Sequence, residues 1–567
     1  MTLRRCIAVA AGRLAGTLSR RLGRGGGTAL PGLVALSLDP GILPHLARQI
    51  PQGAVLITGT NGKTTTSRML AEALRAGAYA PLQNRTGSNL LRGITAAFLA
   101  RTSLRGRLKV VDRSVGVFEV DEAVLPLAIP LVQPRVVLIT NLFRDQLDRY
   151  GEVDTVRSLW QKAVASLPEH TTVVLNADDP AVASLGDFAQ GPVLYFGIED
   201  HRTGSPVLDH AADSLYCLRC GRPYEYTAVL YSHLGHYRCP QCGKGRPRPQ
   251  VSAGRIAFQS FERTQYEMDT PQGRTAVSLN LGGLYNVYNA LGAASASVAL
   301  GLPLSVIREA LARFTPAFGR MERLDLEGRR VCLILVKNPT GFNQVLRTLG
   351  QGLRPHTILM VLNDQIADGQ DISWVWDVDF EELRGPVEKV LERPVGEALD
   401  GPPQELGRGI GEAHELPLHP LHELERGVGE ARERPVGEAL DGPPHELGRG
   451  VGEAHEGPVG EAPDGPPHEL GRGVGEAHEL PLHPLHEHPL LMVSGSRAED
   501  LALRLKYAGL AVPQNSVERD LDRALDLALK ATPVGETLCI LPTYTAMLVM
   551  QRLLARRGHL PHYWEEE

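Results

Sequence analysis

The sequence contains no apolar run that approaches the length of a membrane-spanning helix, and it has no strong excess of charge of either sign. Of its 567 residues, 59 are Lys or Arg and 65 are Asp or Glu, so the formal net charge is −6. Such a chain lacks the basic footprint of a nucleic-acid-binding protein, and we expect no nucleic-acid partner. The lack of a long apolar run argues against a membrane-spanning segment.

The N-terminus also lacks the pattern of a secretory signal peptide. The stretch MTLRRCIAVAAGRLAGTLSRRLGRGGG is basic, but Arg13 interrupts its apolar part and no convincing cleavage site follows. We therefore expect a cytoplasmic protein whose residues 1–50 form a helical segment. Two interpretations of this amphipathic stretch stay open. It is either a helix that packs on the protein, which we favour, or a helix that makes peripheral contact with a membrane surface.

Cysteine is scarce, yet four of the seven cysteines form an ordered set. They occur as CLRC and CPQC, at Cys217, Cys220, Cys239 and Cys242. Two C-x-x-C pairs at this separation predict a zinc ribbon, inserted at about residues 211–249. Four thiolates fill the coordination shell of zinc, so the site is expected to be structural. Disulfide pairing is the alternative, but a reducing compartment disfavours it.

The stretch VLITGTNGKTTTSRML has the character of a shortened phosphate-binding loop. An apolar strand-like run ends at Thr58, and a helical pattern covers residues 67–75. The usual loop has four residues between its first glycine and the Gly-Lys pair, whereas here only two intervene. A strand, a glycine turn and a helix still place backbone N–H groups around an anion. The expected nucleotide-binding residues are Gly59, Thr60, Asn61, Gly62, Lys63, Thr64 and Thr65.

Strand-like and helix-like segments alternate through most of the chain, which predicts an α/β protein with two sheets. We expect a central domain over residues 51–316 and a second α/β domain over residues 317–567. The second is interrupted at about residues 385–488 by near-copies of RPVGEALDGPPHELGRGVGEAHE. These repeats are rich in Gly, Pro, Glu and His and have few large apolar residues, so we expect a disordered insert rather than a solenoid.

Several polar motifs follow predicted strands of the central domain. VFEVDE presents Glu119, a carboxylate suited to hold Mg²⁺ near a nucleotide. Asparagine amides can read an adenine edge through paired donor and acceptor groups. The further candidates in TNLFRDQLDRYGE, LNADDP and GLYNVYNALGA are Asn141, Asn176, Asp179, Asn286 and Asn289.

In this order the motifs resemble the Mur ligase family of ATP-dependent ligases, for which GTNGKTTT is the form of the phosphate loop. The resemblance implies that ATP activates a substrate carboxylate as an acyl phosphate, which an amine then attacks. It also implies that Lys63 holds the phosphates as a catalytic residue and that Thr64 and Glu119 ligate Mg²⁺. Asn286 and Asn289 would face adenine, and Arg320 in FGRME would lie near ATP.

A narrower resemblance is to the MurT-type subunits of lipid II isoglutaminyl synthase. It rests on the ribbon inside the central domain and on GGTALPG, TNLFRDQLDRYGE, KNPTGFN and NDQIADGQDISWVWDVDFE in series. The implied architecture is a central Mur-ligase-type ATPase domain with a Cys₄ zinc ribbon, followed by a Rossmann-like C-terminal domain. Gln146 stands where Mur ligases usually have a histidine near the metal, and no pocket for an amino acid is evident.

The implied reaction is amidation of the α-carboxylate of D-glutamate in the stem peptide of lipid II, at the inner face of the membrane. Ammonia would come from a GatD-type glutaminase partner, whose Cys-His pair Asp371 would complete across the interface. From the residues alone, a turn-capping role for Asp371 is equally reasonable. The alternative function is a Mur-type or folylpolyglutamate-like ligase that adds an amino acid. The implied cofactors are ATP, Mg²⁺ and structural Zn²⁺.

Overall fold

The computed structural model describes residues 3–21, 29–84, 88–144, 153–204, 212–260, 263–315, 320–352, 355–384 and 489–559. The repeats at residues 385–488 lie outside these ranges, and so does Gln146. The expectation of a disordered insert therefore stays a prediction. None of the helices within the described ranges is long and apolar enough to cross a membrane.

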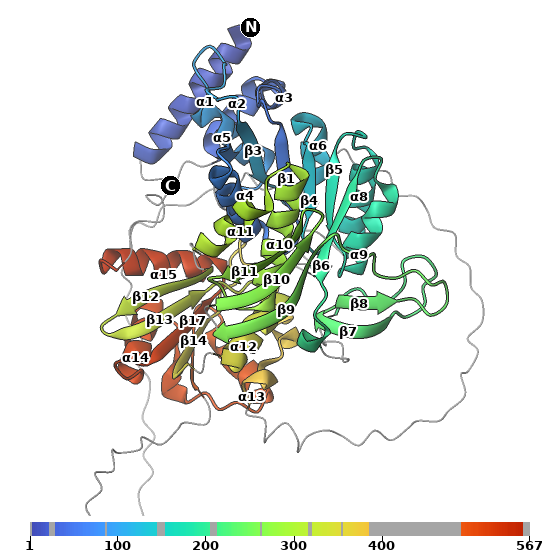
Figure 1. Cartoon of the computed structure of the whole chain (residues 1–567). Coiled ribbons are helices and arrows are strands. Elements are labelled where there is room, and N and C mark those ends of the chain that lie inside the picture. Colours follow the sequence, from blue (N-terminus) through green and yellow to red (C-terminus); the bar gives the residue numbers. More distant parts are fainter. Residues whose placement is uncertain are drawn as a thin grey trace, which may run out of the picture. The chain divides into compact units, whose positions relative to one another are not determined.

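The first sheet has nine strands, and seven neighbouring strands run parallel (Figure 1). The sheet continues with β10, which pairs antiparallel with β9, and with β11, which pairs antiparallel with β10. In spatial order the strands are β11 (Gly273–Leu279), β10 (Arg263–Thr270), β9 (Val251–Ser260), β6 (Val193–Ile198), β5 (Thr172–Asn176), β4 (Val136–Ile139), β1 (Ala54–Thr58), β3 (Ser114–Glu119) and β2 (Ala80–Gln83).

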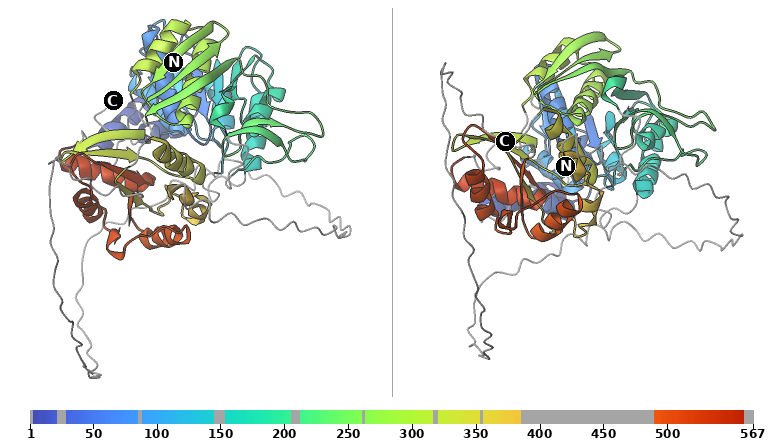
Figure 2. Two further views of the ribbon diagram at one scale, coloured as in Figure 1. Left: turned by 60° about the horizontal axis from the view of Figure 1, so that its bottom comes forward. Right: turned by 90° about the horizontal axis from the view of Figure 1, so that it is seen from below.

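Both faces of this sheet are buried, which explains why its central strands are continuously apolar. In β1, Val55 and Ile57 belong to one core cluster, whereas Ala54 and Leu56 belong to the cluster on the other side. The helices that accompany these strands are α4 (Lys63–Ala76), α5 (Leu91–Ala100), α6 (Leu125–Val132), α8 (Val153–Ala165), α9 (Pro180–Ala183), α10 (Leu284–Ala299) and α11 (Leu304–Arg313). Figure 2 shows α10 and α11 packed beside β9–β11.

Three helices precede the first strand, and a small hairpin follows β6. The helices are α1 (Leu3–Arg21), α2 (Leu30–Leu38) and α3 (Ile42–Ala47), and they contact one another and α5. The short helix η1 (Ser184–Phe188) precedes β6 and η2 (His201–Thr203) follows it. The hairpin consists of β7 (Glu225–Tyr231) and β8 (Leu234–Arg238), paired antiparallel.

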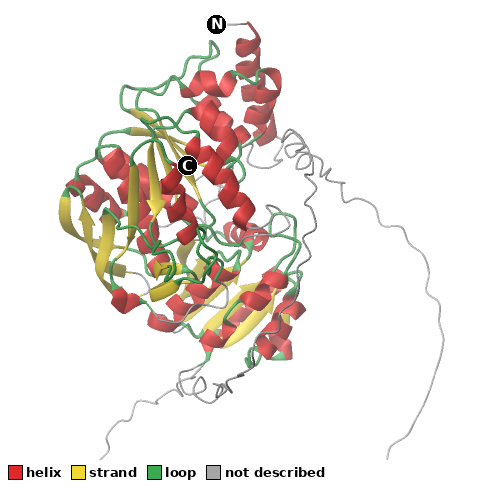
Figure 3. Ribbon diagram, turned by 90° about the vertical axis from the view of Figure 1, so that its right-hand side faces the viewer, coloured by secondary structure: helices red, strands yellow, loops and turns green. Residues whose placement is uncertain are grey.

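The second sheet has six strands and is also mainly parallel (Figure 3). Its spatial order is β12 (Arg320–Leu326), β13 (Arg329–Ile334), β17 (Thr537–Pro542), β14 (Thr357–Val361), β15 (Leu490–Ser494) and β16 (Val517–Glu518). Its helices are α12 (Pro339–Gly352), η3 (Ser373–Asp377), η4 (Phe380–Leu383), α13 (Ala498–Tyr507), η7 (Gln514–Ser516), α14 (Leu521–Ala531) and α15 (Tyr544–Arg556).

The pairing of β14 with β15 joins segments that lie on opposite sides of the repeats. Thr357 is the register partner of Leu490, and the two strands remain paired to Val361 and Ser494. Residues before and after the repeats therefore contribute neighbouring strands to the same sheet. The predicted α/β class is confirmed for both sheets.

Candidate nucleotide site and cysteine ribbon

The glycine-rich turn after β1 leads directly into α4, which begins at Lys63, four residues earlier than the predicted helical pattern. Gly59 and Gly62 both have positive φ angles, of 131° and 87°. A Cβ atom on Gly62 would lie 2.0 Å from Asn289 Oδ1, so only glycine fits there. The first N–H groups of a helix have no partner within it, so the N-terminus of α4 can bind an anionic phosphate.

Lys63 is held at this turn by two oxygen atoms. Its ammonium group donates to Gly59 O at 2.6 Å and to Glu122 Oε1 at 2.7 Å. Burial alone would raise the pKa of Glu122, but the positive charges of Lys63 and Lys337 outweigh it and hold that pKa below its usual range. Glu122 is thus an anionic partner of Lys63, a role that the VFEVDE motif did not reveal.

Thr64 and Glu119 form an oxygen pair suited to Mg²⁺. Thr64 Oγ1 donates to Glu119 Oε2 at 2.7 Å, and both residues are buried. The backbone of Glu119 is held on both sides by Asn84, whose amide accepts from its N–H at 2.9 Å and donates to its O at 3.0 Å. A hydroxyl and a carboxylate are hard ligands that fit magnesium.

Asn61 links the phosphate loop to two other segments. Its N–H donates to Asn141 Oδ1 at 2.8 Å, and its carbonyl accepts from Asn141 Nδ2 at 3.0 Å. Its side chain exchanges hydrogen bonds with that of Asn338, with Nδ2 of Asn338 donating to Asn61 Oδ1 at 3.1 Å. Asn338 follows β13, and its participation could not be found from the KNPTGFN motif alone.

The predicted adenine-facing asparagines lie next to the phosphate loop. Asn289 Nδ2 donates to Asn286 Oδ1 at 3.2 Å, and Asn289 Oδ1 lies 3.4 Å from Thr66 Oγ1 in α4. Asn286 also donates to Gly282 O at 2.7 Å. Both residues are on the first turns of α10 and are buried, so the structure brings them to α4. Their contact with adenine stays a prediction.

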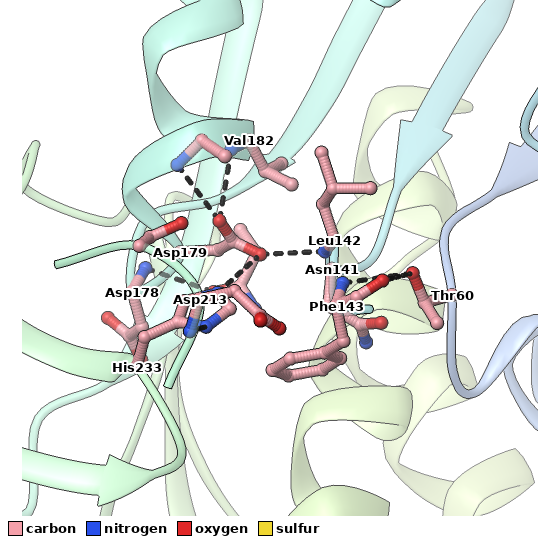
Figure 4. Close-up of polar contacts among 12 residues, drawn as sticks. Thr60, Asn141, Leu142, Phe143, Asp178, Asp179, Val182, Asp213 and His233 are labelled. Carbon is pink, nitrogen blue, oxygen red and sulfur yellow. Dashed lines mark hydrogen bonds and ion pairs between the residues drawn. The ribbon is translucent and has the colours of Figure 1, made fainter. Parts of the chain in front are cut away.

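The LNADDP motif serves mainly to join segments. Asn176 donates to Thr140 O at 3.0 Å. Asp179 accepts from the N–H of Ala181 and Val182 at the start of α9 and from the N–H of Leu142 at 2.8 Å. His233, from the hairpin, lies 3.5 Å from Asp179 Oδ2 (Figure 4).

Leu142 and Phe143 continue this network to the phosphate loop. The N–H of Phe143 donates to Thr60 Oγ1 at 3.0 Å, and Thr60 Oγ1 donates to Phe143 O at 3.1 Å (Figure 4). Arg144 Nε donates to Asp213 Oδ1 at 2.5 Å, and the N–H of Asp213 donates to His233 Nδ1. The network thus runs from Thr60 to the residues beside the cysteine ribbon.

Asp178, the neighbour of Asp179, is a fully buried carboxylate that we did not predict as important. Its Oδ1 accepts from Arg246 Nε at 2.5 Å, and its Oδ2 accepts from Ile198 N at 2.8 Å and Tyr288 Oη at 2.6 Å. Burial, with the nearby Asp178 charge, raises the pKa of Tyr288, so its hydroxyl keeps the proton that it donates. Asp178 thereby joins β5 to β6, α10 and the end of the ribbon.

The four predicted zinc ligands converge. The Sγ atoms of Cys217, Cys220, Cys239 and Cys242 all lie within 4.8 Å of one another. The closest pairs are 3.4 and 3.5 Å apart, far longer than a disulfide bond and close to the roughly 3.8 Å expected between thiolates on one zinc ion. Gly221 and Gly243, each at φ 71°, close the two turns by donating to Cys217 O and Cys239 O. The cluster fits zinc.

Asp371 lies in the second domain, in the segment between β14 and η3, and is exposed. It accepts a hydrogen bond of 2.8 Å from the N–H of Ser373, which holds the pKa of Asp371 below its usual range. Trp376 is 52% exposed and lies against Tyr507, with ring centroids 5.5 Å apart. Trp374 instead packs on the core, so only one of the two tryptophans in this segment exposes its ring.

The last predicted site residue, Arg320, begins β12 and pairs in register with Ile334; its side chain lies outside the described part of the chain. Thr65 is buried in the first turn of α4. Apart from Asp371, Arg320 and the cysteines, the predicted residues lie at or after the carboxyl ends of β1, β3, β4 and β5 or in the first turns of α4 and α10.

Known proteins resemble both α/β domains of the chain. A model of the Mur ligase middle domain matches residues 57–222, and a model of the MurT ligase C-terminal domain matches residues 335–392 and 479–547. The subunit MurT of lipid II isoglutaminyl synthase from Streptococcus pneumoniae is 33% identical over 383 residues, or 68% of this chain and 82% of the relative. The same subunit from Staphylococcus aureus strain COL is 33% identical, covering 67% and 83%.

Solved structures share the fold at lower identity. A pseudomurein peptide ligase type C from Methanothermus fervidus has a TM-score of 0.53 and 19% identity, covering 89% of this chain and 79% of that one. MurF from Acinetobacter baumannii has a TM-score of 0.53 and 16% identity, covering 92% and 80%. These similarities establish the fold.

The buried Asp178 generates a prediction about stability. In Asp178→Asn, one carboxylate oxygen becomes an amide NH₂ group, which is a hydrogen-bond donor. In one orientation it faces Arg246, and in the other it faces Ile198 N and Tyr288 Oη, so in both orientations two donors are brought together. We expect a loss of about 3 kcal/mol in the free energy of unfolding, measured by denaturant titration. The matched control is Glu199→Gln, which removes the exposed partner of the same arginine at 2.7 Å and should lose less than about 1 kcal/mol. Equal losses would contradict the role given to Asp178.

Proposed function

Because the chain belongs to the family of MurT subunits of lipid II isoglutaminyl synthase, we propose that it is the ATP-dependent ligase of such a synthase. Its substrate is the D-glutamate α-carboxylate of the lipid II stem peptide, which becomes D-isoglutamine through an acyl phosphate. Ammonia comes from a GatD-type glutaminase, and the reaction takes place at the inner face of the membrane.

One observation carries the ATP-dependent part of the proposal: the start of α4 gathers Lys63, Thr64 and their two carboxylate partners. Magnesium neutralises phosphate charge when bound, and Thr64 with Glu119 would hold it. Lys63 would move its ammonium from Glu122 to the phosphates and stabilise the transferring group. Asn286 and Asn289, beside the loop, would contact the adenine, and Arg320 would lie near ATP.

The supply of ammonia is supported by the surface around Asp371. The exposed carboxylate is held by the backbone of Ser373, and Ile366, Trp376, Leu503 and Tyr507 expose large apolar side chains in the same domain. Enrichment of exposed aromatic residues is typical of a protein interface. Asp371 would orient the imidazole of the glutaminase and favour its cationic form while the partner's cysteine attacks glutamine.

Zinc would hold the ribbon together rather than take part in the chemistry, since four thiolates leave no open coordination position. We expect one zinc ion per purified chain, measured by metal analysis, and its loss in Cys220→Ser. Because structural zinc contributes directly to folding, the variant should also lose stability in the ribbon. Cys6→Ser, which changes a cysteine outside the cluster, is the control and should keep its zinc. A wild-type chain without zinc would contradict the assignment.

The proposed reaction is tested by mass analysis of lipid II incubated with ATP, glutamine, the chain and its co-purified glutaminase. The stem peptide should change by the mass difference between Glu and Gln. Lys63→Ala removes the positive charge that would stabilise the transferring phosphoryl group and should lower the rate at least about a hundredfold. Its zinc content and helical signal should match those of the unaltered chain.

Two other results would redirect the proposal. Addition of a whole amino acid would favour the Mur-type or folylpolyglutamate-like ligase. Full activity of a correctly folded Lys63→Ala variant would remove this loop from the nucleotide site.

Asp371→Asn separates glutamine hydrolysis from ligation. The variant keeps the hydrogen bond from Ser373 but loses the charge that acts on the partner's imidazole. We expect glutamine hydrolysis by the complex to fall at least about a hundredfold, whereas ATP binding and ligation with free ammonium remain. Asp377→Asn is the control, because Asp377 lies 3.7 Å from Arg144 and is engaged within the chain. Undiminished hydrolysis in Asp371→Asn would exclude this residue.

A further inference from the structure

The N-terminal helix α1 presents an apolar stripe on its exposed side. Leu3, Ile7, Leu14 and Leu18 recur at spacings that bring them to one side of a helix, and they are 77%, 51%, 61% and 49% exposed. Isolated exposed apolar residues need no explanation, but three leucines and one isoleucine on one helix face form a continuous feature. α1 lies beside α2 at the N-terminal end of the described chain (Figure 1).

Close packing on the opposite side of α1 keeps this stripe outward. Ala8 and Val9 are fully buried. A Cβ atom on Gly12 would lie 2.7 Å from Pro31 O, and one on Gly16 would lie 2.7 Å from Pro31 Cγ. α1 therefore packs on α2 through its smallest residues. If α1 rotated about its axis to bury the apolar stripe, the close contact of Gly12 and Gly16 with Pro31 would be lost.

A basic loop adjoins α1. Arg13 Nη1 donates to Thr102 O at 2.9 Å, which ties the helix to residues 101–113. That loop exposes Leu104 and Val111, 61% and 62% accessible. Its exposed basic side chains are Arg101, Arg105, Arg107, Lys109 and Arg113.

The charge of these two segments is opposite to that of the whole chain. Residues 3–21 and 101–113 contain ten basic residues and one acidic residue, whereas the chain has a net charge of −6. The first acidic residue is Asp39, and it forms an ion pair of 3.0 Å with Arg5. Exposed apolar side chains in segments with a net excess of positive charge match an anionic lipid surface, which takes up apolar side chains and attracts Arg and Lys.

We propose that α1 and the 101–113 loop form a docking surface for anionic membrane lipids. The leucines enter the boundary between headgroups and acyl chains, and the arginines remain at the phosphate level. A membrane contact of this kind deepens the proposed function, because it would bring the ligase to a membrane-anchored substrate. The evidence for this docking surface is the exposure of its apolar side chains and the charge of its basic ones, and the test of membrane binding requires no ligase activity.

The test is flotation of the full chain with vesicles of equal parts phosphatidylglycerol and phosphatidylcholine, compared with vesicles of phosphatidylcholine alone. We expect at least about tenfold stronger partition into the anionic vesicles, weakened by added salt. Leu14→Gln with Leu18→Gln should lower this partition about tenfold, and so should Arg105→Gln with Arg107→Gln. Leu527→Gln, at an exposed leucine of α14, is the control and should bind as the unaltered chain does.

Circular dichroism would establish that each variant keeps its helical content. Equal partition into both kinds of vesicle, or no partition, would overturn the proposal. A concentration-dependent dimer in sedimentation that the Leu14 and Leu18 substitutions abolish would instead assign the stripe to a second copy of the chain.

Discussion

Two adjacent buried carboxylates at the end of β5 hold the central domain together. Asp178 binds Arg246, Ile198 and Tyr288, and Asp179 binds the start of α9 and the N–H of Leu142. A buried carboxylate is unfavourable unless its oxygens are fully paired. Each carboxylate oxygen of Asp178 and Asp179 accepts at least one hydrogen bond here. Moving any of the donor segments would leave a buried charge without its partner.

A chain of polar contacts connects the cysteine ribbon to the phosphate loop. His233 from the hairpin lies beside Asp179, and Asp213, before the first cysteine pair, binds Arg144. Arg144 follows Phe143, which exchanges hydrogen bonds with Thr60 in the phosphate loop. The ribbon thus supports residues 141–144 from one side, while the phosphate loop contacts them from the other. A zinc ion held by the four cysteines would therefore influence, through these contacts, how the phosphate loop is held.

Features encoded by neighbouring residues were predictable from the sequence, whereas contacts between distant residues were not. The strand–glycine–helix pattern at residues 55–76 and the two C-x-x-C pairs each indicate a local geometry with a known chemistry. The pairing of Lys63 with Glu122 depends on β1 and β3 being neighbours, and that of Asn61 with Asn338 joins residues 277 apart. Asp178 resembled a surface-turn residue in LNADDP. Trp374 and Trp376 looked equivalent in sequence, but η3 turns the first onto the core and exposes the second.

The Lys63–Glu122 pair would also allow a buried ammonium to serve a nucleotide that binds and leaves, as proposed above. An unpaired buried charge is strongly destabilising, whereas exchanging one anionic partner for another keeps the charge compensated throughout. A phosphate arriving at the start of α4 would replace Glu122 as the partner of Lys63. Glu122 would not be left alone, because the charge of Lys337, from the second domain, also acts on it and favours its ionised form. Lys337 precedes Asn338, which already binds Asn61 in the phosphate loop. The same short segment of the second domain therefore contacts the loop and stabilises the carboxylate that Lys63 must release.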